Sequence, residues 1–169
     1  MSGLVIWSHG AEAPPWGTKS IRLAAIANEM GFEFQAPDFT DLSSPDDRTE
    51  RLAALIDDRQ PDVLAGSSMG GYASLAAGSN KVIPGLFLLA PALYMPGYAI
   101  TEFSPKASAI TVIHGWRDEV VPVENSIHFA SKHLTNLHII DADHRLAGRT
   151  NDIAELFRLF LASLPSHQS

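Results

Sequence analysis

Short apolar runs and longer stretches with helical periodicity alternate along this chain. The run at residues 85–89 (GLFLL) contains no alternating polar positions, which is typical of a strand covered on both faces. Between such runs, apolar residues recur at spacings of three and four, as in Ile153, Leu156 and Phe157, and this spacing predicts amphipathic helices. The alternation of the two patterns predicts a parallel sheet with helices on both faces.

The pattern predicts six strands and five helices. Strands are expected at residues 4–8, 33–36, 63–67, 85–89, 110–114 and 137–140. Helices are expected at residues 18–30, 45–59, 69–77, 123–133 and 151–164. The length of 169 residues suits one domain. We therefore expect residues 1–169 to form a single α/β domain, a three-layer, doubly wound and mostly parallel sheet.

Composition excludes several classes of protein. Apolar residues make up 46% of the chain and charged residues 18%, which is a globular balance and not that of a disordered chain. There is no cysteine, so disulfide scaffolds, thiol nucleophiles and thiolate metal sites are excluded. The net charge of −7 argues against a nucleic-acid partner. No apolar run reaches the ~20 residues of a membrane helix, and the first residues lack a basic signal-peptide region, so we expect a cytoplasmic protein with no membrane partner.

The segment at residues 63–72 carries the most specific motif. It contains Gly66-x-Ser68-x-Gly70 directly after a predicted strand and directly before a predicted helix, which is the setting of a nucleophile elbow. The spacing of the glycines selects Ser68 as the nucleophile, because Ser67 has no glycine at either flanking position. The alternative is a glycine-rich turn that only closes a βα unit.

Two further segments supply the partners that a serine nucleophile needs, a base and an orienting carboxylate. Asp118 follows the strand expected at 110–114, although Glu119 is a rival and an ordinary loop or capping aspartate is the alternative. His144 follows the strand expected at 137–140 and lies in a loop. Parallel strands bring their carboxyl ends to one edge, where ligands bind, so the three residues are expected to meet.

The chain order of serine, aspartate and histidine is the order found in α/β-hydrolases, and differs from those of chymotrypsin-like and subtilisin-like enzymes. Four segments carry this resemblance through nearly the whole chain: His9-Gly10, Gly66-x-Ser68-x-Gly70, His114-Gly115-x-x-Asp118-x-x-Val121-Pro122 and Asp143-His144. The chain resembles the short serine esterases and thioesterases of that superfamily, which have no lid or cap domain.

The resemblance implies a minimal fold of this type and a set of roles. These are Ser68 as nucleophile, Asp118 as acid, His144 as base, and the backbone N–H groups of Ala11 and Met69 as oxyanion hole. The loop reads His-Gly-Ala and not His-Gly-Gly-Gly, so Gly10 is the alternative to Ala11 as donor. His9 is interpreted as a structural residue that shapes this loop.

Residues 90–109 occupy the place where larger members insert a cap domain, and the segment is only twenty residues long. We interpret it as a short, stiff wall over the substrate pocket, with Tyr94 and Met95 as pocket residues together with Gly10 and Trp116. A loop packed on the core is an equally weighted alternative.

The expected reaction is hydrolysis of a small carboxylic ester or thioester through an acyl-serine, with no cofactor. No His-Glu-x-x-His motif or nucleotide-binding glycine motif occurs, and His128 and His133 are spaced too far apart to share a helical face, so no metal is expected. Alternatives are acyl transfer or perhydrolysis by the same residues, or an interaction protein that keeps the fold with weak catalysis. The sequence makes no prediction of the oligomeric state.

Overall fold

All six strands of the computed structural model, which describes residues 3–165, pair in parallel into one sheet. The order across the sheet is β2-β1-β3-β4-β5-β6. The strands are β1 (Gly3–Ser8), β2 (Phe32–Gln35), β3 (Val63–Ser67), β4 (Gly85–Leu89), β5 (Ala109–Gly115) and β6 (Asn136–Ile140).

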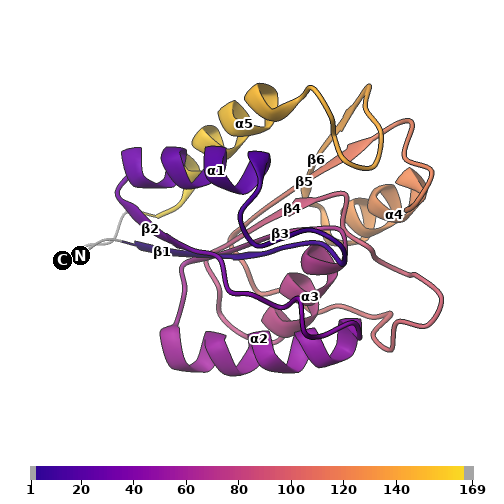
Figure 1. The fold of residues 1–169 in the computed structure, drawn as a ribbon, viewed down its shortest axis with the longest axis horizontal. Coiled ribbons are helices and arrows are strands. Elements are labelled where there is room, and N and C mark those ends of the chain that lie inside the picture. Colours follow the sequence, from indigo (N-terminus) through magenta and orange to yellow (C-terminus); the bar gives the residue numbers. More distant parts are fainter. Residues whose placement is uncertain (1–2, 166–169) are drawn as a thin grey trace.

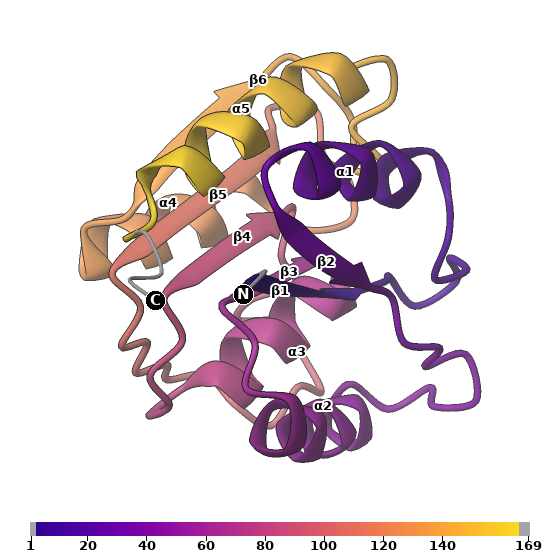
Figure 2. The same ribbon diagram turned by 90° about the vertical axis from the view of Figure 1, so that its left-hand side faces the viewer.

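Five helices cover the two faces of the sheet (Figures 1 and 2). They are α1 (Thr18–Glu29), α2 (Pro45–Arg59), α3 (Met69–Gly78), α4 (Val123–His133) and α5 (Thr150–Ser163). Helices α1 and α5 pack on one face, and α2, α3 and α4 contribute to the core on the other. The predicted class, a doubly wound parallel α/β fold, is confirmed, and each predicted element lies within one residue of the observed bounds.

Local sequence explains where the elements begin and what they bury. Helix α2 starts after Ser44, whose hydroxyl accepts a hydrogen bond of 3.2 Å from the Asp47 N–H, and Pro45 takes the first helical position. In the α1–α5 layer, Phe157 is fully buried, and its ring centroid lies 4.8 Å from that of Phe87. Burying one such side chain contributes about 1.5–3 kcal/mol, so the apolar stripe predicted on the last helix holds that helix on the sheet.

The strand order reverses between β1 and β3. From β1 the chain passes through α1 to the edge strand β2, and it then returns through α2 on the opposite face to β3. The loops after β1 and β3 therefore leave the sheet beside one another and diverge. In open α/β sheets this reversal, at the carboxyl ends of the strands, is where ligands bind.

Candidate active site

Ser68 occupies the turn between β3 and α3 in a strained backbone conformation. Its φ of 55° and ψ of −118° lie outside the regions that non-glycine residues ordinarily adopt. Two glycines make the turn possible. A Cβ atom at Gly66 would overlap the Gly70 carbonyl group, and a Cβ atom at Gly70 would overlap that of Ser8. The close approach of β1, β3 and α3 thus depends on the glycines that define the motif, as a nucleophile elbow requires.

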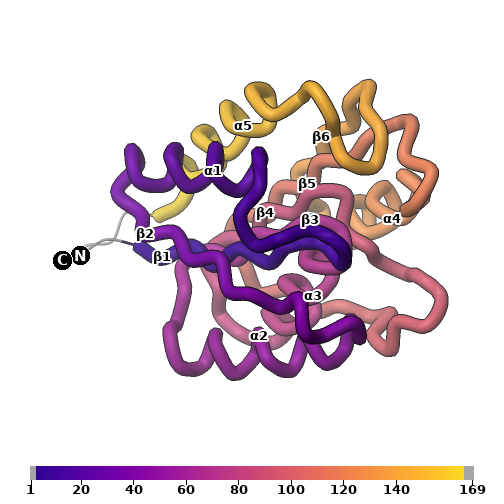
Figure 3. The backbone as a smooth tube through the Cα atoms, in the orientation of Figure 1, coloured from indigo at the N-terminus to yellow at the C-terminus, as the bar shows by residue number. Residues whose placement is uncertain are grey.

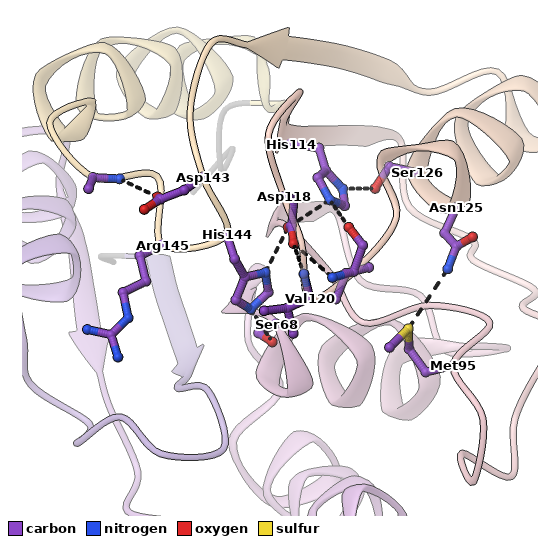
Figure 4. Close-up of polar contacts among 12 residues, drawn as sticks. Ser68, Met95, His114, Asp118, Val120, Asn125, Ser126, Asp143, His144 and Arg145 are labelled. Carbon is purple, nitrogen blue, oxygen red and sulfur yellow. Dashed lines mark hydrogen bonds and ion pairs between the residues drawn. The ribbon is translucent and has the colours of Figure 1, made fainter.

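A continuous chain of contacts links Ser68, His144 and Asp118 (Figure 4). Ser68 Oγ lies 2.9 Å from His144 Nε2, and His144 Nδ1 lies 2.7 Å from Asp118 Oδ2. When Nδ1 carries the proton and donates a hydrogen bond to the carboxylate, Nε2 can accept a hydrogen bond from the serine hydroxyl. The structure therefore brings together the three residues that the sequence predicted from loops after β3, β5 and β6.

The Asp118 side chain is fully buried and is held by backbone donors. Its Oδ1 atom accepts hydrogen bonds of 2.8 Å from the N–H groups of Val120 and Val121. Burial raises the pKa of Asp118, but the hydrogen bond from His144 and those from the two N–H groups outweigh it, so the pKa lies below its ordinary value. The carboxylate is thus kept ionised. Its rival Glu119 is exposed, and the contact to His144 Nδ1 comes from Asp118.

His114 lies behind Asp118 and has no solvent exposure. Its Nε2 atom is 3.0 Å from Asp118 Oδ2 and 3.0 Å from the carbonyl oxygen of Val121, and its Nδ1 atom is 2.6 Å from Ser126 Oγ. Because both neighbours of Nε2 are acceptors, we assign the proton to Nε2 and let Nδ1 accept from the Ser126 hydroxyl. Burial lowers the pKa of His114, which favours this neutral form.

His114 belongs to one of the motifs that carry the family resemblance, but no role was predicted for it from the sequence. The signal was its place one residue before the turn glycine at the end of a buried strand.

The loop after β1 is shaped by His9 and Arg48. His9 Nδ1 donates to the Gly10 carbonyl at 2.8 Å, and Nε2 accepts from the Phe39 N–H at 2.9 Å. The Arg48 guanidinium is buried and donates to the carbonyl oxygens of His9, Gly10 and Ala11 at 2.9, 3.2 and 3.4 Å. These contacts fix the orientation of the loop's peptide planes.

Sequence reasoning missed Arg48. The sequence feature that could have indicated its burial is its position: Arg48 lies on the same helical face as the apolar residues Leu52 and Ile56.

A cleft of about 830 Å³ opens where the loop after β1 faces the loop after β6. Ser68 and His144 line it, as do Gly10 and Ala11. Gly10 lies against the elbow, since a Cβ atom there would be 3.8 Å from the Ser68 Cβ. Met69, the first residue of α3, is buried directly after Ser68. The assignment of Ala11 and Met69 as oxyanion donors stays a prediction.

Solved structures share both this fold and its size. A proposed hydrolase of the α/β superfamily from Xanthomonas campestris pv. campestris matches with a TM-score of 0.89 and 30% identity over 97% of this chain and 100% of that one. The chain belongs to the α/β-hydrolase superfamily. The ydeN gene product of B. subtilis matches over 96% of this chain and 100% of its own, at 17% identity and a TM-score of 0.78.

An esterase domain from Rhodothermus marinus matches over 95% of this chain and 84% of its own, at 18% identity and a TM-score of 0.68. Below 25% identity these likenesses show the fold alone. No protein-family model matches this α/β hydrolase, and no curated protein matches it.

The segment between β4 and β5 departs from the interpretation as a pocket wall. This α/β hydrolase has no cap domain there among its described residues. Instead Ala92, Leu93 and Phe103 are buried in the core beside α3 and α4, and the trace in Figure 3 runs away from the α1–α5 layer. The alternative, a loop packed on the core, is the one that the structure supports.

Three of the four predicted pocket residues lie outside the cleft. Tyr94, Met95 and Trp116 are not among the residues that line the cleft. The Tyr94 ring packs against those of Phe103 and His128, with centroids 5.8 and 5.0 Å away. The Met95 sulfur lies 3.9 Å from Asn125 Nδ2, and the Trp116 side chain is largely exposed. The apolar character of Tyr94 and Met95 reflects core packing, and Gly10 alone of the four lines the cleft.

Within residues 3–165, the acidic and histidine side chains form no group of three or more that could hold a metal ion. No helix in this part of the chain is long and apolar enough to cross a membrane.

Proposed function

We propose that this α/β hydrolase cleaves a carboxylic ester or thioester of a small substrate through an acyl-serine intermediate. The observation that carries the proposal is the unbroken path from Ser68 Oγ through His144 to a buried, ionised Asp118. Such a path gives a serine hydroxyl both a base and an oriented imidazole.

In the acylation step, Ser68 Oγ attacks the substrate carbonyl carbon while His144 Nε2 accepts the hydroxyl proton. The imidazolium that forms is stabilised by the Asp118 carboxylate, which also keeps the ring in the required tautomer. The tetrahedral intermediate collapses when His144 returns the proton to the leaving alcohol or thiol. A water molecule then attacks acyl-Ser68 with His144 again as base, and the acid is released.

The negative charge on the carbonyl oxygen needs hydrogen-bond donors in both steps. Met69 begins α3, and the first N–H groups of a helix have no partner within the helix. The Gly10 carbonyl points to Arg48. Because the C=O and N–H of a trans peptide point in opposite directions, the Ala11 N–H points away from Arg48. We assign the oxyanion hole to these two N–H groups.

Structural neighbours are consistent with an ester substrate. Two matches carry the name esterase, the Rhodothermus marinus domain and esterase PE8. Their identities are below 20%, so they make ester hydrolysis the first reaction to test and leave the substrate open.

The test is covalent labelling with a fluorophosphonate, followed by intact mass and peptide mapping. We expect one adduct, on Ser68, because it is the serine within residues 3–165 that has His144 within hydrogen-bond distance. Ser68→Ala should abolish the adduct and the hydrolysis of p-nitrophenyl and thioester substrates of graded chain length, whereas Ser67→Ala should still be labelled. An adduct on Ser67, or none on the folded protein, contradicts the assignment.

A further inference from the structure

Two cationic side chains line the cleft beside Ser68, although the chain as a whole carries a net charge of −7. Lys19 comes from the first turn of α1, and Arg145 directly follows His144. The Lys19 Nζ donates a hydrogen bond of 2.8 Å to the Arg145 carbonyl oxygen, so the two sides of the cleft are joined at this point. The Lys19 ammonium group is thereby held next to the backbone of the residue that follows His144.

The Arg145 guanidinium has no acidic partner in the part of the chain that the structure describes. Among the hydrogen bonds and ion pairs of residues 3–165, only its backbone carbonyl takes part, and Figure 4 shows its side chain extending beside His144. Of the other exposed or partly exposed arginines, Arg51, Arg117, Arg149 and Arg158 are paired with carboxylates. Arg22 and Arg59 have no ion pair within residues 3–165 either, but they lie outside the cleft. An arginine left unpaired in a cleft has five N–H donors available for a planar anion.

The charge of Arg145 also disfavours the charged form of Lys19. Burial lowers the pKa of Lys19, and the nearby charge of Arg145 lowers it further, while Asp143 acts more weakly in the opposite direction. The Asp143 carboxylate is itself engaged by the Ala147 N–H at 3.2 Å. One acidic residue, the exposed Glu12, also lines the cleft. A bound anion would relieve the repulsion between Lys19 and Arg145.

We propose that the substrate carries a carboxylate or phosphate group, and that this group binds between Lys19 and Arg145 while the scissile carbonyl lies at Ser68. The inference rests on the proposed function and narrows its substrate class to anionic esters or thioesters. Arginine suits such a group because its planar fork can donate two parallel hydrogen bonds, and lysine adds a compact charge.

The experiment compares pairs of esters in which one member carries an added anionic group, and the variants are compared with the wild type on the same pair. In the first pair, mono-p-nitrophenyl adipate carries a carboxylate in its acyl half, and p-nitrophenyl hexanoate is its neutral counterpart. In the second set the charge lies in the alcohol half: 4-acetoxybenzoate carries a carboxylate, 4-acetoxyphenyl phosphate carries a phosphate, and phenyl acetate is the neutral counterpart of both. This set therefore also shows which of the two anionic groups the cleft prefers. The quantity measured is kcat/KM at low salt, expressed as the ratio of charged to neutral ester.

We expect the wild type to prefer the charged member of at least one pair. Lys19→Met and Arg145→Gln should each lower that ratio about tenfold or more, the value of one hydrogen bond between charged groups. Lys19→Arg should retain the ratio, because it keeps the charge. Arg22→Gln removes one charge from the same helix outside the cleft, and it should change neither the ratio nor the activity.

The outcomes separate the inference from the function on which it rests. If neutral esters are hydrolysed and Ser68 is labelled, but no charged ester is preferred, the inference is wrong and the function stands. Variants of Lys19 that slow both members of a pair equally also overturn it, since Lys19 would then only brace the loops. If Ser68 neither reacts nor supports hydrolysis of any ester, the proposed function fails and the inference fails with it.

Discussion

At the scale of single residues, Asp118 is the carboxylate that contacts His144 Nδ1, and the N–H groups of Val120 and Val121 hold it in place. Asp118→Asn should reduce turnover by up to about 10⁴-fold, the loss known for the corresponding change in a serine protease, because an amide can hold the imidazole in the wrong tautomer. The measurement is kcat on a p-nitrophenyl ester with folding checked by circular dichroism. The matched variant is Glu119→Gln at the exposed neighbour, which should stay close to wild type. If the two results are reversed, the acid has been misassigned by one residue.

His114 is a positioning residue, because it reaches the reacting atoms only through Asp118. His114→Met removes the donor to Asp118 Oδ2 at similar volume, and we expect kcat to fall about tenfold with KM little changed. In His114→Gln the amide nitrogen occupies the place of Nε2, so it should recover most of the loss. A purely structural role would instead lower the stability of both variants and leave kcat of the folded fraction unchanged.

At the scale of elements, the elbow depends on how closely three backbones approach. Gly70→Ala places a methyl group against the carbonyl groups of Ser8 and His9, and backbone atoms cannot move aside as a flexible side chain can. We expect a loss of about 1–3 kcal/mol or more in the free energy of unfolding, measured in urea. Gly10→Ala is the control, because its added methyl would meet neighbours only at 3.7 Å or beyond. Equal losses in both variants would contradict this account of the elbow.

The elements themselves were predictable from the sequence, and their contacts were less so. Buried strands such as β4 and the capped start of α2 follow from local patterns, and the order of Ser68, Asp118 and His144 along parallel strands places them at one edge. Side-chain partners that arise from tertiary packing leave weaker signals. Arg48 reaches carbonyls 37 to 39 residues away, and the aromatic Tyr94 reads equally well as a pocket wall or as core until its contacts are known.

At the scale of the whole molecule, the cleft lies where the doubly wound topology opens. The loops after β1 and β3 diverge at the reversal of strand order, and the loops after β5 and β6 bring Val120, His144 and Arg145 to the same edge. The central strands below them, such as β3 and β4, are largely buried. The candidate site is therefore formed without a cap domain among the described residues.

Stability should depend on pH through histidines that the fold keeps neutral. His9 and His114 are buried, and burial lowers the pKa of each; the pKa of the partly buried His133 is lowered in the same way. In the unfolded chain a histidine has a pKa of about 6.5. Below that pH the unfolded state takes up protons that the folded state does not. The free energy of unfolding is therefore highest, as far as these histidines determine it, above about pH 6.5, and it decreases as the pH falls below that value.

We expect urea unfolding between pH 7.5 and 5.5 to show this decrease, with each such histidine adding at most about 1.4 kcal/mol per pH unit. His114→Gln removes one titrating group while keeping a donor to Asp118, so its slope below pH 6.5 should be shallower than that of the wild type. Arg22→Gln is the control, because it removes one positive charge, as the loss of a protonated histidine does. An arginine does not titrate in this pH range, so this variant should keep the wild-type slope. Stability that is constant or rises on acidification through pH 6 would show that the buried histidines accept protons in place. In that case the Nε2–H assignment of His114 behind Asp118 would have to be replaced by an imidazolium that donates from both nitrogens.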